Sequence, residues 1–313
     1  MGNRLADNIN YKQGYALRGL AMLLIILVHS LNEYDVYTSA LSHYLLIPML
    51  GTLACSLFFF MSGYGLFHSL KKEGAQLNGK YLYNHLVKFI APFAVIYLAS
   101  FVILPHTMAE SQTAADYTKI FTLSLPDGTD MWFLKVTLFN YITTFLLCKA
   151  QTTDKRKIIY ITAVQAVLIA ILYLNKCAGY CYISNMSFAV GALYAIQKDY
   201  NRKTVIAATL VFAIYYIGMN CGISTAPLQI VGNIAICIIA AALLKNVKRA
   251  PSWLQYMGRH SLSYYLMAIP VMWLVPSDNL HYICYFLVNL MLTTTAVALY
   301  NLLDKHIIKH LLA

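Results

Sequence analysis

The sequence predicts an all-α membrane protein, a polytopic bundle of about ten transmembrane helices with both termini in the cytoplasm. Three observations lead to this fold class. Of the 313 residues, 60% are hydrophobic and only 11% are charged, whereas a soluble domain carries about 25% charged residues. The apolar residues form long runs that lack the strict alternation of a membrane β-barrel. Lysine and arginine gather in every second connection between these runs, as the positive-inside rule requires.

The ten predicted helices come from counting apolar runs, because a bilayer core requires about 20 mostly apolar residues per helix. Several runs are shorter and need flanking polar residues to complete the span. No small-residue cleavage site follows the first run, so we expect a retained helix rather than a signal peptide. In order, the runs are approximately 14–32, 44–68, 86–104, 131–148, 158–174, 181–196, 204–219, 227–244, 260–275 and 281–303.

The orientation follows from the basic residues. With a cytoplasmic N-terminus, 20 of the 23 lysines and arginines lie on the cytoplasmic side, and only Lys119, Lys135 and Lys176 lie toward the outside. A wrong helix count would scramble this split, so it supports both the ten spans and the cytoplasmic termini. The net charge of +11 therefore reflects topology. Because the basic residues form no stripe with interleaved aromatics, we expect no nucleic-acid partner.

We expect one transmembrane domain over residues 1–313, because no repeat or low-complexity tract divides the chain. Its longest connections are a basic inner one at about 69–85 and an outer one at about 105–130 that contains four acidic residues and two prolines. Seven scattered cysteines, an odd number, define no disulfide framework. We expect no metal site.

The first run carries polar residues that are costly in hydrocarbon and that usually mark a pathway or a site. Arg18 and His29 are 11 residues apart, which places both on one face of a helix and about 16 Å apart along its axis. Glu33 follows His29 at i+4, where a carboxylate could orient the imidazole and raise its basicity. Simpler interpretations are a snorkelling arginine, a hydrogen-bonding histidine between helices and a loop glutamate.

Further polar groups occur at the ends of the next three runs. Ser62, Gly63 and Gly65 in "MSGYGL" would permit close helix approach or a local break. Trp132 fits an interfacial anchor, and Lys135 one turn later either snorkels outward or faces a cavity. The basic residues of "KYLYNHLVKFIAP", among them Lys80 and Lys88, fit either the positive-inside rule or a phosphorylated ligand.

Four stretches in this order resemble the acyltransferase-3 family of membrane acyltransferases. "RGLAMLLIILVH" matches the R-x10-H signature, "FFFMSGYGL" resembles the FF-x-SGF element, and "MWFLKVTLFNY" resembles the W-F-L element. "LQYMGRHSLSYYLMAIPV" is similar to the late L-G-x-x-S-x-x-x-Y-L-x-H-x-P stretch. Together the matches extend from residue 18 to about 271.

The resemblance implies transfer of an acyl group, usually acetyl, from cytoplasmic acyl-CoA to a surface polysaccharide, lipopolysaccharide, peptidoglycan or small lipid or sugar. It implies a multi-pass protein of the bacterial cytoplasmic membrane, in contact with membrane lipids, that uses acetyl-CoA as donor substrate without a permanently bound cofactor. His29 then becomes the catalytic residue, with Arg18 as its partner and Glu33 beside it. A homodimer is left open. The residues expected to contact the donor are Arg18, Lys80, Lys88, Ser62, Trp132 and Lys135.

The chain departs from the family pattern in three places. Asn84, His85 and Lys88 stand where family members commonly have arginines, Met267-Ala268 replaces the late histidine, and no extracytoplasmic hydrolase-like domain follows the tenth run. A second hypothesis is a transporter or exporter of lipid-linked sugars, in which Arg18, His29 and Glu33 line the pathway. Such transporters often show inverted repeats and broken helices, and the sequence shows neither.

Overall fold

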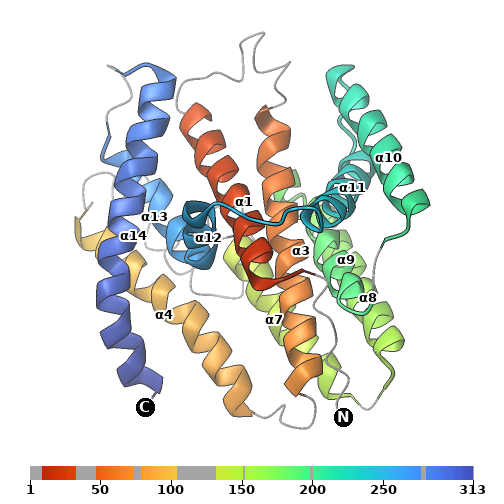
Figure 1. The fold of residues 1–313 in the computed structure, drawn as a ribbon, viewed down its shortest axis with the longest axis horizontal. Coiled ribbons are helices and arrows are strands. Elements are labelled where there is room, and N and C mark those ends of the chain that lie inside the picture. Colours follow the sequence, from red (N-terminus) through yellow and green to blue (C-terminus); the bar gives the residue numbers. More distant parts are fainter. Residues whose placement is uncertain are drawn as a thin grey trace. The chain divides into compact units, whose positions relative to one another are not determined.

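A computed structural model describes residues 9–32, 47–73, 79–103, 132–150, 152–197, 200–275 and 280–312. Every regular element within these ranges is a helix, which confirms the predicted all-α class (Figure 1). The helices are α1 (Tyr11–Asn32), α3 (Ile47–Glu73), α4 (Gly79–Ile103), α7 (Trp132–Lys149), α8 (Asp154–Leu174), the 3-10 turn η3 (Gly179–Cys181), α9 (Met186–Tyr194), α10 (Arg202–Asn220), α11 (Ala226–Leu244), α12 (Ser252–Arg259), α13 (Ser261–Trp273) and α14 (Tyr282–Leu312).

Each of the ten predicted apolar runs falls on one of these helices. Six described helices are long and apolar enough to cross a membrane, namely α1, α3, α8, α10, α11 and α14. By contrast, α9 has nine residues and α13 has 13, fewer than the roughly 20 that a span requires. A multi-pass membrane protein is therefore confirmed, and the number of ten spans stays a prediction.

The chain divides into two compact units. Unit 1 comprises Met1–Ala21, Met49–Ala75 and Pro126–Arg259, and unit 2 comprises Met22–Pro48, Gln76–Leu125 and His260–Ala313. The division falls within α1, which contributes its first half to unit 1 and its second half to unit 2. The expectation of a single functional domain over the whole chain stays a prediction.

Glycines set the packing of α3 against α9 in unit 1. A Cβ atom at Gly63 would collide with the Phe188 carbonyl, and one at Gly191 would collide with the Phe60 carbonyl. The two backbones therefore meet as in other membrane helix pairs with small contact residues. Since α3 continues unbroken through this point, the "SGYG" segment is a site of close approach and not a helix break.

A second close contact joins α1 to α12 within unit 1. A Cβ atom at Gly19 would collide with the Leu254 carbonyl, and one at Gly258 would collide with the Tyr15 carbonyl. Each glycine thus lies against the backbone of the other helix. The glycine of the late "YMGRHS" stretch consequently has a structural role, because a side chain there would push α12 away from α1.

Polar caps begin three helices of unit 1, as expected for residues that accept hydrogen bonds from unpaired backbone N–H groups. The Asn10 side chain accepts from the Gln13 amide at 2.9 Å, and Gln13 Oε1 accepts from the Asn10 amide at 3.0 Å, which is a reciprocal capping arrangement. Thr153 caps α8, and Asn201 caps α10. These caps fix where each chain segment enters its helix.

The inner connection is shorter than the predicted 69–85, because α3 extends to Glu73 and α4 begins at Gly79. Lysine and glutamate are good helix formers, and Lys71 Nζ also pairs with the Asp154 carboxylate at 2.8 Å. This ion pair joins the end of α3 to the first turn of α8. The predicted outer connection at 105–130 lies outside the described residues.

Two hydrogen bonds between buried polar groups join neighbouring elements of unit 1. Gln165 Nε2 donates to Asn140 Oδ1 at 2.8 Å between α8 and α7. The Ser184 hydroxyl donates to the Thr52 carbonyl at 2.9 Å. None of the seven cysteines forms a disulfide, so the thiols contribute to the interior as small, mostly apolar groups.

In unit 2, tyrosine hydroxyls join α13 to α14. The Tyr264 hydroxyl bonds the Thr294 hydroxyl at 3.1 Å, and the Tyr285 hydroxyl donates to the Met272 carbonyl at 3.2 Å. Both rings are buried, so these contacts pair polar groups within an apolar interior.

We predict that Gly63→Val lowers the melting temperature of the detergent-solubilised protein, because the added side chain must separate α3 from α9. Overpacking of a close contact typically costs about 1–3 kcal/mol. Ala207→Val, which adds a similar volume at an exposed position of α10, serves as the control and should leave the melting temperature nearly unchanged. Equal melting temperatures for the two variants would contradict the close contact.

Candidate functional site

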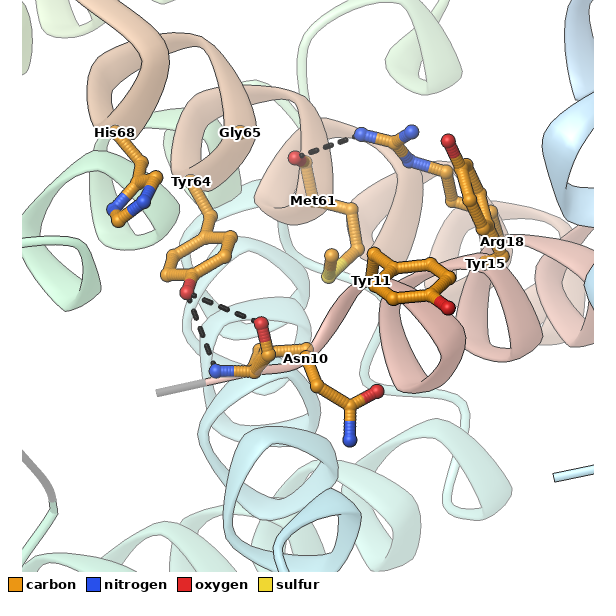
Figure 2. Close-up of a pocket in the computed structure, with 10 residues that line it drawn as sticks. Asn10, Tyr11, Tyr15, Arg18, Met61, Tyr64, Gly65 and His68 are labelled. Atoms are coloured by element: carbon orange, nitrogen blue, oxygen red, sulfur yellow. Dashed lines mark hydrogen bonds between the residues drawn. The ribbon is translucent and has the colours of Figure 1, made fainter. Parts of the chain in front are cut away.

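A pocket of about 240 Å³ lies in unit 1 between the N-terminal turns of α1 and the C-terminal half of α3 (Figure 2). Both walls come from elements whose positions are fixed by glycine contacts and caps. Its lining combines aromatic rings with one arginine and one histidine. The lining residues are Ile9, Asn10, Tyr11, Gly14, Tyr15, Arg18, Met61, Tyr64, Gly65 and His68.

The α1 wall of the pocket follows helical periodicity. Tyr11, Tyr15 and Arg18 are spaced at i, i+4 and i+7, which places them on one face of the helix. Gly14 lies between them, where a Cβ atom would approach the Met61 methyl group to 2.9 Å. The absent side chain at Gly14 therefore lets α1 and α3 lie close together beside the pocket.

Arg18 is held in place by the backbone of α3. Its Nη2 donates to the Met61 carbonyl at 3.2 Å, as Figure 2 shows. A Cβ atom at Gly65 would lie only 3.3 Å from the same nitrogen, so the glycine makes room for the guanidinium. Because a guanidinium carries five N–H donors, this arrangement leaves others for an anion in the half-buried pocket.

Tyr64 closes the opposite side of the pocket. Its hydroxyl accepts from the Ile9 amide at 3.2 Å and lies 3.4 Å from the Ile9 carbonyl. The Tyr64 ring also stacks on His68, with an interplanar angle of 18° and centroids 5.8 Å apart. One buried hydroxyl thus joins the segment before α1 to α3 and defines the end of the cavity (Figure 2).

Gln13 connects the α1 wall to the end of α11. Its Nε2 donates to the Leu244 carbonyl at 2.7 Å and to the Val247 carbonyl at 3.1 Å. These carbonyls belong to the last turn of α11 and its continuation, where intrahelical partners run out. The same side chain therefore completes both the α1 cap and the α11 terminus.

Two further basic groups lie beside aromatic rings of the pocket. The Arg259 guanidinium carbon lies 5.5 Å from the centre of the Tyr15 ring, and Lys12 Nζ lies 5.9 Å from that of Tyr11. No aspartate or glutamate is among the residues that line the cavity in the described part of the chain. An anion that also presents a planar or apolar portion fits this combination of an arginine with aromatic walls.

The predicted residues are distributed over both units. Arg18 lies in unit 1 and His29 in unit 2, on one continuous helix, and both are half-buried. Glu33 lies outside the described residues. Lys80 is exposed at the first turn of α4 in unit 2, and Lys88 belongs to α4 with its side chain outside the described set. The roles of these residues stay predictions.

The remaining predicted residues lie in unit 1. Ser62 is half-buried in α3, next to the close contact at Gly63, and Lys135 is half-buried in α7. Trp132 is buried, and its ring lies 6.3 Å from that of Phe59 and 5.8 Å from that of Tyr180. Trp132 therefore packs α7 against α3, and its predicted contact with a donor stays a prediction.

The sequence motifs missed most of the pocket. Among its lining residues only Arg18 and Gly65 were singled out, Gly65 for helix packing, whereas Tyr11, Tyr15, Tyr64 and His68 were not. A detectable signal was present, because the tyrosines recur at helical spacing on the face that carries Arg18. Aromatic residues at this spacing usually belong to a core, and only the contact with α3 distinguishes them.

A family model described as an acyltransferase domain matches residues 16–302. This match covers most of the chain and includes helices of both units. No curated protein and no solved structure matches the chain.

We predict that Tyr64→Phe increases hydrogen exchange at the Ile9 amide about two- to tenfold, because the amide loses a hydrogen bond worth about 0.5–1.5 kcal/mol. The ring and its packing are retained. Tyr160→Phe removes a hydroxyl from an exposed tyrosine of α8 and should leave this exchange rate unchanged. Exchange mass spectrometry of the N-terminal peptide measures the difference, and unchanged exchange in Tyr64→Phe would contradict the closure.

Proposed function

The chain belongs to the acyltransferase-3 family, and from this premise we propose that it transfers an acyl group, most simply acetyl, from cytoplasmic acyl-CoA to a hydroxyl group. The acceptor we propose is a cell-surface glycan or a lipid-linked sugar. The observation that carries this proposal is the presence of a pocket lined by Arg18 and aromatic rings, with a histidine further along the sequence of the same helix.

The pocket suits the nucleotide end of acyl-CoA. Arg18 offers N–H donors to a phosphate in the bidentate geometry that a guanidinium favours, and Tyr11 and Tyr15 present aromatic faces to the adenine ring. The basic residues beside these rings add favourable charge. Lys80 and Lys88 of α4 are further proposed phosphate contacts, and Ser62 and Lys135 are proposed contacts along the donor.

Further along α1, His29 is the proposed general base. Its ring nitrogen takes the proton of the acceptor hydroxyl as the oxygen attacks the thioester carbon. The new C–O bond forms, the C–S bond breaks, and the imidazolium returns the proton to the leaving thiolate. The alternative is transfer through an acyl-imidazole: a His29 ring nitrogen displaces the thiolate, with a C–N bond formed as the C–S bond breaks. The acceptor oxygen then forms the C–O bond as the C–N bond breaks, and the hydroxyl proton passes to the thiolate. Glu33 is proposed to orient the ring.

The helical rise supports a division of labour between Arg18 and His29. Eleven residues span about 16 Å along the axis, a separation that a long, thin pantetheine arm can bridge. We propose ten spans with cytoplasmic termini in the bacterial cytoplasmic membrane, which places Arg18 toward the cytoplasm and His29 toward the outside. A donor then enters from one side, and an acceptor reaches the thioester from the other or from the membrane.

We predict that His29→Ala abolishes transfer of radiolabelled acetyl groups from acetyl-CoA to lipid- or glycan-linked products in membranes that carry the protein. Loss of a general base typically costs about 10²–10⁴-fold in rate. His281→Ala, at an exposed histidine before α14, is the matched control and should label normally. If a folded His29→Ala variant labels as well as the wild type, His29 has no catalytic role. Movement of a lipid-linked sugar across vesicles without labelling would instead support a transporter.

We also predict that Arg18→Gln raises the KM for acetyl-CoA about 10- to 100-fold, because a hydrogen bond to a charged group contributes about 1.5–3 kcal/mol. Arg18→Lys should give an intermediate KM, since lysine keeps the charge but lacks the planar fork. Arg156→Gln removes an exposed arginine from α8 and should have no effect. A lower kcat with an unchanged KM in Arg18→Gln would show that this pocket does not hold the donor.

A further inference from the structure

The α11–α12 connection and α12 form an exposed surface that the proposed acyl transfer does not use. We call it the α12 face and define it by Lys248, Arg249, Trp253 and Tyr256, all of which are exposed. The two aromatic side chains are large for such exposure, at 55% for Trp253 and 38% for Tyr256. The connection passes close to the N-terminal end of α1 (Figure 1), where Gln13 donates hydrogen bonds to the Leu244 and Val247 carbonyls.

Helical geometry separates the packed and exposed sides of α12. Leu254 and Gly258, at i and i+4, meet the α1 backbone. At 100° per residue, Trp253 and Tyr256 project from the opposite side, whereas the Arg259 guanidinium lies over the Tyr15 ring of α1. One side of α12 therefore packs on α1, and the other side exposes two aromatic rings beside basic groups.

Among the described residues, the α12 face carries only positive charge. The sequence contains no aspartate or glutamate between Asp199 and Asp278. Within the described residues, no ion pair involves Lys248, Arg249 or Arg259. A surface of one sign, with tryptophan and tyrosine among the cations, combines the two features that favour the boundary between lipid head groups and acyl chains.

We propose that the α12 face docks on the anionic lipid head groups of the membrane that the protein spans. The basic residues attract the phosphates, and Trp253 and Tyr256 place their rings at the level of the head groups. Since α12 lies on Tyr15 and Gly19 by backbone contact, docking anchors the N-terminal end of α1. This inference goes beyond acyl transfer and holds whichever substrate the pocket accepts.

The test uses the full chain with Trp253 as its only tryptophan, through Trp132→Phe and Trp273→Phe, reconstituted in lipid nanodiscs. Brominated phosphatidylglycerol or brominated phosphatidylcholine is supplied at a matched mole fraction, and quenching of Trp253 fluorescence is measured. We expect quenching to report enrichment of the anionic lipid, by up to about fivefold for each basic residue near the surface. High salt should reduce this preference because it screens exposed charges.

Lys248→Gln with Arg249→Gln should bring quenching by the two lipids close to equality. Lys155→Gln with Arg156→Gln removes the same charge from exposed positions of α8 and should preserve the preference. Equal quenching by the two lipids in the protein with an unsubstituted α12 face would overturn the proposal. Absence of quenching by either lipid would also overturn it, because protein or solvent would then cover α12. The salt titration requires no substitution in the α12 face. The proposal can therefore be tested even if the double variant fails to fold.

Discussion

Backbone contact between helices is the constraint on which the rest of unit 1 depends. Gly63 and Gly191 bring α3 against α9, and Gly19 and Gly258 bring α1 against α12. In hydrocarbon no hydrophobic effect drives helices together, so close packing at small residues carries much of the association. Gly14 and Gly65 let α1 and α3 lie close together, and the Met61 carbonyl is then within reach of Arg18. The pocket is thus a product of glycine positions as much as of its polar residues.

The composition of α1 reconciles two requirements that ordinarily conflict in a membrane. Its interior must be apolar enough to span, with a mean hydropathy of 1.7 in its most apolar window, yet it carries both Arg18 and His29. The arginine satisfies part of its hydrogen-bonding capacity on the backbone of α3, which lowers the cost of desolvation.

Sequence patterns were sufficient for the helical class and for the approximate positions of the helices, because long apolar runs are the strongest signal in a membrane protein. They overestimated the lengths of α9 and α13, which are shorter than their apolar runs. The motifs identified Arg18, but the pocket around it depends on tertiary contacts such as the Tyr64 hydroxyl with Ile9. The role of Gln13 at both the α1 cap and the end of α11 could not be predicted either, since its partners Leu244 and Val247 lie more than 230 positions away in the sequence.

The Gln13 contact has a consequence for biosynthesis. The ribosome synthesises the chain from the N-terminus to the C-terminus, so α1 enters the membrane long before Leu244 and Gly258 have been made. During that interval the first helix lacks its hydrogen-bond partners on α11 and its backbone contact with α12. Helix α1 is consequently made well before the partners that complete its environment, although the residues that line the pocket at Arg18 all precede α7. A nascent chain stalled within α11 would hold Arg18 and Lys12 without Arg259, the second basic residue beside the pocket.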